Sequence, residues 1–210
     1  MRIGIVGSGA IGGPLGRLWA QAGHDVMFSS RHPDQLRTLV TAAGSKARAG
    51  SANEAMDFGQ IVLEAVPFAA SLDLPADRLA GKALISASNY YPQRAGEIDL
   101  GGMSQSEALA QRLPGVTVVK AFNMMFAEEM KARANGEIED PLAIFCAGGS
   151  ADAKTTTASL IEAAKFAPVD AGPLAAGWIF ESGGPLYAKR MSANEAKSKL
   201  EEFVRNGAQS

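Results

Sequence analysis

Short apolar runs and helical patterns alternate along the first 120 residues of this chain. Residues 2–6 are apolar on both faces, which is typical of a strand buried inside a parallel sheet. Apolar residues then recur at helical spacing over residues 15–22, and a second strand is predicted at residues 25–28. The pattern therefore predicts a βαβ unit whose first strand is central in a sheet.

The same alternation continues after this unit. We predict, in chain order, a helix over residues 33–43, strands over 61–65 and 83–87, a helix over 104–113 and a strand over 116–119. Strands and helices that alternate in this way predict an α/β fold with a doubly wound parallel sheet.

The alternation becomes less regular after about residue 121. We expect a strand over 142–147, a helix over 151–164, a short strand over 167–169 and Ala-rich helices to the end. The pattern predicts two domains, residues 1–125 and a smaller α/β domain of residues 126–210, with the boundary somewhere in residues 120–140.

Composition excludes several classes of function. Twenty Lys and Arg against 22 Asp and Glu give a net charge of −2, so no basic field is present to attract nucleic acid. The apolar runs are far shorter than the ~20 residues that span a bilayer. The N-terminus reads as a strand rather than a secretory signal, so we expect a cytoplasmic protein. Cys146 is the single cysteine, and with two histidines no metal site is expected.

A glycine-rich turn follows the first strand directly and opens the first helix. It consists of Gly7, Ser8, Gly9, Ala10, Ile11 and Gly12. Gly7 suits the tight turn, Gly9 carries no side chain to hold a pyrophosphate away, and Gly12 allows close packing of helix and strand. Backbone N–H groups at the helix start attract phosphate. We predict dinucleotide binding; the alternative is a glycine-rich turn without a ligand.

The end of the second strand indicates which dinucleotide is preferred. NAD-binding proteins usually carry an acid there, whereas this chain has Ser29, Ser30, Arg31 and His32. Hydroxyl and guanidinium donors suit a 2′-phosphate. We therefore predict NADP(H) as the cofactor; the alternative is that Arg31 is a solvated charge at a helix start.

Two later strand ends are expected to reach the same crevice, because ligands of open parallel sheets lie beyond the carboxyl ends of the strands. The first comprises Ala65, Val66, Pro67 and Phe68, of which Val66 and Phe68 are expected to wall the nicotinamide side. The second offers the amide of Asn89. Plain loop packing is the alternative for both, and above all for Tyr90 and Tyr91.

No catalytic residue can be assigned from the pattern. The chain has no Tyr-x-x-x-Lys pair and no well-placed histidine that would protonate a reduced carbonyl. Hydride transfer to a flavin-like ring needs less help, since that ring spreads the charge itself. Lys120 is the exception: it is either a proton donor or a surface charge at a strand end.

Several segments together resemble the NADPH-dependent coenzyme F420 (deazaflavin) reductases. They are the opening MRIGIVGSGAIG, SSR at residues 29–31, AVPF at 65–68, VKAFN at 119–123 and DAGPL at 170–174. The resemblance implies a Rossmann domain with a small C-terminal domain for substrate binding or dimerisation, a homodimer, and hydride exchange between NADPH and the deazaflavin. It also implies that Ser8, Ser30 and Arg31 hold phosphates, while Asn123, Met125 and Ala127 border the two rings.

The chain departs from this family where the second substrate is expected. Residues 123–126 are bulky and apolar, and residues 182–184 read Ser-Gly-Gly. Two alternatives therefore stay open. One is reduction of a small imine or carbonyl, as in the pyrroline-carboxylate reductases, which share the opening motif. The other is a non-catalytic NADP sensor.

Overall fold

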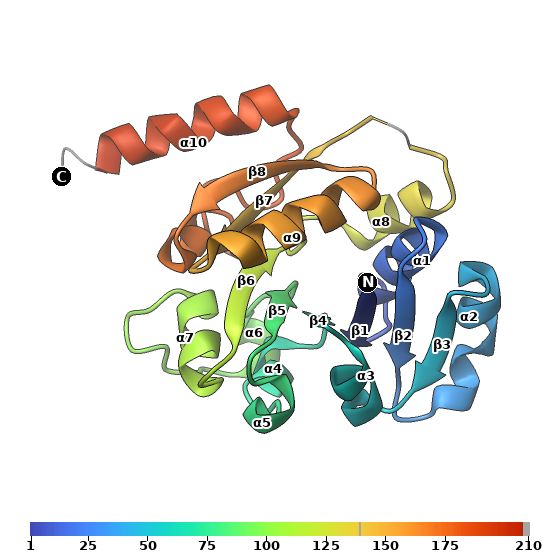
Figure 1. Cartoon of the computed structure of the whole chain (residues 1–210). Helices are drawn as coiled ribbons and strands as arrows, with labels where there is room; N and C mark the ends of the chain where they lie inside the picture. Colours follow the sequence, from blue (N-terminus) through green and yellow to red (C-terminus); the bar gives the residue numbers. More distant parts are fainter. Residues whose placement is uncertain (139, 208–210) are drawn as a thin grey trace.

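Eight strands form one sheet in the computed structural model, which describes residues 1–138 and 140–207 (Figure 1). The strand order is β3-β2-β1-β4-β5-β6-β7-β8. The strands are β1 (Arg2–Val6), β2 (Asp25–Ser29), β3 (Ala47–Gly50), β4 (Ile61–Glu64), β5 (Ala83–Ser86), β6 (Thr117–Ala121), β7 (Ala143–Gly148) and β8 (Ala167–Gly172). All neighbouring strands are parallel except β6 and β7, which confirms the predicted doubly wound, mostly parallel sheet.

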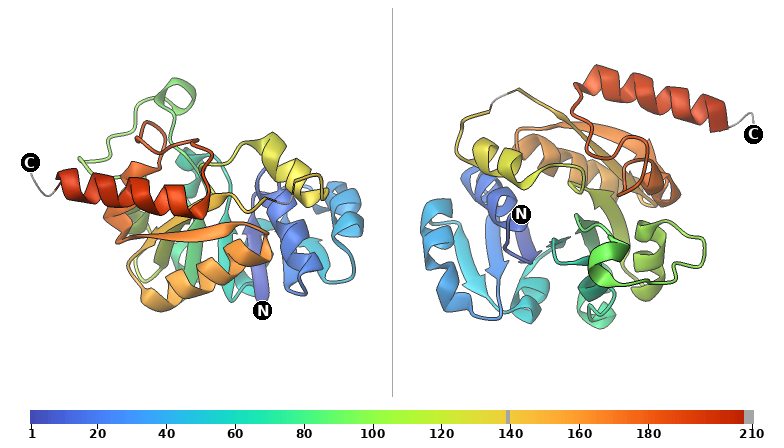
Figure 2. Two further views of the ribbon diagram at one scale, coloured as in Figure 1. Left: turned by 90° about the horizontal axis from the view of Figure 1, so that it is seen from above. Right: turned by 180° about the vertical axis from the view of Figure 1, so that it is seen from behind.

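Helices cover both faces of the sheet. They are α1 (Gly12–Gln21), η1 (Pro33–Leu36), α2 (Arg37–Ala43), α3 (Ala52–Phe58), α4 (Phe68–Ser71), α5 (Ala76–Leu79), α6 (Pro92–Ala95), α7 (Gln105–Arg112), α8 (Ala127–Ala134), α9 (Ala151–Ala163), η2 (Leu174–Ile179) and α10 (Ala193–Gly207). Figure 2 shows α8 beside α1, and α9 and α10 on opposite faces of β7 and β8.

The two core clusters follow from the period-2 alternation of strand side chains. Leu63, Ile85 and Val119 belong to the cluster beneath α1 and α9. The preceding residues Val62 and Leu84 belong to the cluster beneath α3, α5 and α7. Because side chains alternate, Glu64, Ser86 and Lys120 lie on the α3–α7 side of the sheet, with the second cluster.

Most predicted elements are confirmed, with ends shifted by one to three residues. The predicted helix over 33–43 is split into η1 and α2, and the predicted C-terminal helices are η2 and α10, separated by a loop. The prediction missed β3, α3 and α8, and also the four-residue helices α4, α5 and α6. The strand β3 reads Ala-Arg-Ala-Gly, which carries no apolar alternation. The seven-residue helix α3 is started by a capping box between Ser51 and Glu54, a local signal rather than a periodic one.

Residues 126–207 add two strands to the same sheet. The strand β7 pairs antiparallel with β6, and β8 pairs parallel with β7. A hydrogen bond of 2.8 Å from the Trp19 ring N–H in α1 to the Leu160 carbonyl in α9 joins the two parts further. The division into domains 1–125 and 126–210 stays a prediction. Within the described ranges, no helix combines the length and apolar character that crossing a membrane requires.

Candidate functional site

Two glycines of the first turn are required by the protein itself. Gly7 has a φ of +97°, a conformation that side chains disfavour, and a Cβ there would lie 2.6 Å from the Ala65 carbonyl oxygen. A Cβ on Gly12 would lie 2.1 Å from the Gly7 carbonyl oxygen. The turn between β1 and α1 therefore closes only with glycine at these two positions.

Gly9 is different, because it is exposed and a Cβ there would meet no atom within 4 Å. Packing therefore does not explain why this position has no side chain. No side chain caps the start of α1 at Ile11. The Gly13 N–H donates to the Gly9 carbonyl at 2.9 Å and Pro14 has no N–H, so the N–H groups left for an anion are those of the turn up to Gly12. An uncapped helix start beside a bare glycine fits the pyrophosphate of a dinucleotide.

Two serine hydroxyls fasten this turn to the end of β2. The Ser29 N–H donates to Ser8 Oγ at 3.0 Å, and the Gly7 N–H donates to Ser29 Oγ at 3.3 Å. Ser29 is buried, at 4% exposure, whereas Ser8 is half-buried. Each hydroxyl keeps its own O–H to donate. Both serines thus shape the turn, and their predicted contact with a cofactor stays a prediction.

The loop after β2 carries the residues that are predicted to contact the 2′-phosphate. The Ser30 hydroxyl accepts a hydrogen bond from the His32 N–H at 3.0 Å. Arg31 and His32 are exposed, and Arg31 has no carboxylate within 4.0 Å among the described residues. Because β2 is paired in parallel with β1, the loop that carries Arg31 leaves the same end of the sheet as the glycine turn.

The loop after β4 contributes less than the sequence suggested. Ala65 and Val66 are half-buried and Pro67 is exposed. The Phe68 ring is only 2% exposed and packs 5.6 Å from the Tyr90 ring, so it belongs to the second core cluster and not to a cleft wall. Val66 is therefore the apolar side chain of this loop that can face a ligand.

A pair of amides joins the loops after β5 and β6. Asn89 Nδ2 donates to the Asn123 carbonyl at 2.7 Å, and Asn123 Nδ2 donates to Asn89 Oδ1 at 3.0 Å and to the Phe180 carbonyl at 2.8 Å. Phe122 has a φ of +62°, an unfavourable conformation that turns the chain at this point. Asn123 Oδ1 is buried and has no hydrogen-bond partner among the described residues.

The other two residues implied by the resemblance follow Asn123 on the same loop. Met125 is half-buried, and Ala127 is exposed at the start of α8. Met125 packs against the first core cluster, as does Ile11 of the glycine turn.

A buried polar row crosses three adjacent strands, and the sequence analysis did not find it. Glu64 on β4 is the register neighbour of Ser86 on β5, which is the register neighbour of Lys120 on β6. Glu64 Oε2 accepts hydrogen bonds from the hydroxyls of Ser86 and Ser88, at 2.9 and 3.0 Å. Glu64 Oε1 accepts from the Val66 N–H at 3.1 Å. The row therefore lies directly below the loops after β4 and β5.

Lys120 is not a surface charge, because its side chain is 0% exposed. Its Nζ donates to the Ser88 carbonyl, and no carboxylate oxygen lies within 4.0 Å among the described residues. Burial lowers the pKa of the Lys120 ammonium, and the charges of Glu181 and Glu64 offset this only in part. Burial likewise raises the pKa of the Glu64 carboxyl, against the opposing effect of Lys120.

Glu181 ties the segment after η2 to the start of α7. Its carboxylate accepts from the N–H groups of Gln105 and Ser106, each at 2.9 Å, and from the Ser106 hydroxyl. Ser182 Oγ donates to the Tyr90 carbonyl at 2.6 Å. The segment is therefore held against the loop after β5, although 90 residues separate the two in sequence.

Two tyrosine hydroxyls also meet across this junction. The hydroxyls of Tyr91 and Tyr187 are hydrogen-bonded, and both side chains are half-buried. The Arg94 guanidinium carbon lies 5.1 Å from the centre of the Tyr91 ring. Burial raises the pKa of the Tyr187 hydroxyl, and its hydrogen bond with Tyr91 raises it further. Tyr187 is therefore a neutral phenol at ordinary pH.

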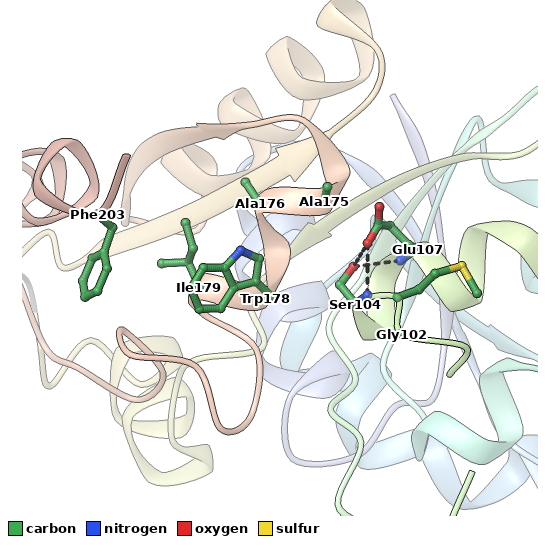
Figure 3. A pocket seen from close by; sticks show the side chains of 9 residues that line it. Gly102, Ser104, Glu107, Ala175, Ala176, Trp178, Ile179 and Phe203 are labelled. Atoms are coloured by element: carbon green, nitrogen blue, oxygen red, sulfur yellow. Dashed lines mark hydrogen bonds between the residues drawn. The ribbon is translucent and has the colours of Figure 1, made fainter. Parts of the chain in front are cut away.

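An apolar groove of about 530 Å³ lies between η2, the start of α7 and α10 (Figure 3). It is lined by Gly102, Met103, Ser104, Glu107, Ala175, Ala176, Trp178, Ile179 and Phe203. Trp178 is 54% exposed, and Glu107 on this wall is engaged with Ser104 in the capping box of α7. The groove adds an open apolar surface at the junction of η2, α7 and α10.

The sheet and the glycine turn together form a Rossmann-type fold suited to a dinucleotide, and comparisons with known proteins agree. Residues 2–90 match the family described as NADP oxidoreductase coenzyme F420-dependent. The part of the chain from β1 to the loop after β5 is therefore similar to this family.

Relatives of known sequence and structure extend the likeness beyond residue 90. The chain is 32% identical over 176 residues to the metalloreductase STEAP3 of Rattus norvegicus, covering 83% of this chain but 34% of that protein. A hypothetical protein from Sinorhizobium meliloti has 30% identity, a TM-score of 0.75, and coverage of 91% and 95% of the two chains. The chain thus spans about a third of its curated relative and nearly all of a solved one.

Two further solved structures share the fold at lower identity. A protein named as an F420-dependent NADP reductase from Arthrobacter sp. has 24% identity and a TM-score of 0.67, over 83% of this chain and 86% of its own. An imine reductase from Pseudomonas sp. has 21% identity and a TM-score of 0.62, over 83% and 57%. At such identities the likeness concerns the fold alone.

Proposed function

We propose that this oxidoreductase transfers hydride between NADPH and a deazaflavin, coenzyme F420, or a flavin-like acceptor. The uncapped start of α1 beside Gly9 carries the cofactor part of the proposal, because only a ligand gives that bare position a purpose. Ser30 and Arg31 hold the 2′-phosphate in this proposal, through a hydroxyl and a guanidinium donor. When bound, NADPH supplies a hydride from its dihydronicotinamide ring.

The acceptor part is supported by what lies around the ring site. Glu64 and Lys120, the ionisable side chains nearest the ends of β4 and β6, are both buried. An acceptor that spreads charge over its own rings places the smallest demand on such a site, since the protein needs mainly to hold two rings together. Val66, Asn123 and Met125 provide apolar and amide surface for that purpose.

Reduction of a small imine or carbonyl is the second candidate, and one observation favours it. The paired hydroxyls of Tyr91 and Tyr187 bring two phenols to the loop after β5, where a neutral phenol is a suitable acid for a nitrogen or alkoxide that gains a proton. A homodimer and a cytoplasmic location stay predictions.

A turnover assay distinguishes these functions. The protein is incubated with NADPH and, in turn, with F420, FMN, FAD, a ferric chelate and a cyclic imine, while the nicotinamide absorbance band is followed. We expect oxidation with F420 or a flavin. Turnover with the imine alone, lost in Tyr187→Phe, favours the second candidate. Tight NADPH binding without turnover by any of these acceptors supports the non-catalytic sensor and contradicts both.

A further inference from the structure

The Lys120 side chain is fully buried and makes few hydrogen bonds. A lysine ammonium has three N–H donors, and the one hydrogen bond that the described structure gives it goes to the Ser88 carbonyl. The side chain is fully buried, and neither Glu64 nor Glu181 brings an oxygen within 4.0 Å. A buried ammonium with so few partners is readily converted to the neutral amine.

The surroundings of Lys120 place this weakly held proton below the predicted ring site. Its hydrogen-bond acceptor Ser88 precedes Asn89, and Asn123 lies three residues after Lys120 on the same strand and loop. Glu64 binds the Val66 N–H in the same layer. Val66, Asn89 and Asn123 are the residues that reach the crevice beyond the strand ends, where the nicotinamide is expected.

The charge of the nicotinamide ring depends on its oxidation state. The dihydronicotinamide ring of NADPH is neutral, whereas the ring of NADP⁺ carries one positive charge. A positive charge over a buried ammonium is repelled strongly, because the low dielectric of the interior screens little. The charged groups acting on Lys120 from its neighbours are Glu64 on β4 and Glu181 after η2, and both favour keeping the proton.

We propose that Lys120 releases its proton to solvent when a cationic nicotinamide ring occupies the crevice, and keeps it when the ring is neutral. The inference rests on the proposed NADP site. Binding of NADP⁺ then sets free a proton that binding of NADPH does not. Reciprocally, the neutral amine favours NADP⁺. Lys120 acts here as a positioning residue that adjusts the charge below the ring, without touching the substrate.

Proton counting by calorimetry tests the proposal directly. Each cofactor is titrated into the protein in two buffers that differ in ionisation enthalpy, and the buffer dependence of the heat gives the protons released. We expect NADP⁺ to release about half a proton to one proton more than NADPH near the pKa of Lys120. The 2′-phosphate is common to both cofactors, so its own titration cancels in the difference.

A pair of lysine variants identifies the group. Lys120→Met is expected to abolish the difference, because it retains the shape but not the ionisable nitrogen. Lys82→Met is the matched control, because Lys82 also donates to a backbone carbonyl, that of Met56. Lys82 directly precedes the first residue of β5, whereas Lys120 lies near the last residue of β6, so the two lysines are at opposite ends of these parallel strands. This control is expected to retain the wild-type difference.

A second measurement uses the wild type alone and keeps the proposal testable if Lys120→Met does not fold. The ratio of NADP⁺ to NADPH affinity is expected to rise with pH, by up to about tenfold per pH unit for one linked proton. Equal proton release by both cofactors, together with a constant ratio, overturns the inference. A difference that persists in folded Lys120→Met also overturns it. No heat with either cofactor overturns the proposed function instead.

Discussion

The glycine turn after β1 and the buried polar row of Glu64, Ser86 and Lys120 lie at the same end of the parallel strands but are built in opposite ways. The turn is a continuous stretch of six residues, in which Gly7 and Gly12 are required by backbone contacts nearby. The row combines Glu64, Ser86 and Lys120 from three strands, with Glu181 added from the segment after η2. In the turn, the backbone provides the chemistry, whereas in the row the side chains do.

This difference shows which kind of site each part of the fold supplies. A backbone turn binds a ligand shared by many proteins, because N–H groups are independent of side-chain identity. A row of buried ionisable groups is specific to this arrangement of strands, and its charge responds to what lies above it. The four variants below test whether a change in one region affects the other, beginning with the largest expected effect on stability.

Gly12→Val is expected to damage the turn most severely. The added side chain meets the Gly7 carbonyl oxygen at 2.1 Å and the Ile5 side chain at 3.0 Å, so α1 must move away from β1. We expect the free energy of unfolding to fall by about 2–4 kcal/mol and NADPH affinity to fall more than about a hundredfold. Urea unfolding and calorimetry measure the two effects.

Gly9→Ala is the control within the same turn. Its Cβ has open space in the protein, so the free energy of unfolding is expected to change by less than about 0.5 kcal/mol. NADPH affinity is expected to fall about tenfold, because the methyl group occupies the space of the pyrophosphate. Unchanged NADPH affinity in Gly9→Ala contradicts the assignment of the turn.

Glu181→Ala tests the non-local region. The change leaves the N–H groups of Gln105 and Ser106 without their acceptor and removes a negative charge from the vicinity of Lys120. We expect the free energy of unfolding to fall by about 2–4 kcal/mol, as measured by urea unfolding. Glu107→Ala, on the same helix start but in an ordinary capping box, is expected to cost only about 1 kcal/mol. Equal losses would show that Glu181 is merely a helix cap.

Arg31→Glu has the smallest effect on the protein and the most selective effect on the cofactor. Arg31 is exposed, so stability is expected to stay within about 0.5 kcal/mol. Loss of a charge-assisted hydrogen bond of about 1.5–3 kcal/mol is expected to weaken NADPH binding about tenfold to a hundredfold. NADH affinity is expected to change much less. The exposed Arg37→Glu serves as the control, and equal losses for both cofactors in Arg31→Glu refute the role of Arg31.

Much of the fold was predictable because its signals are local. The buried strands β1, β4, β5, β6 and β7 show as apolar runs, and the helices α1, α7 and α9 show as periodic stretches. The weak strand β3 and the helix α8 lack such signals, and tertiary pairing decides them. Glu64 is also a signal in the sequence: it ends an otherwise apolar strand, where a buried carboxylate needs partners.

The sequence by itself determined the glycine turn, the absence of an acid after β2 and the alternation of strands, because each depends on residues within a few positions of one another. Only the tertiary structure decided that Lys120 is buried, that Phe68 belongs to the core, and that Glu181 reaches α7. These outcomes depend on strand register and on contacts between segments far apart in the chain. The role and pKa of an ionisable residue do not follow from the sequence alone, because its burial and its partners are set by packing.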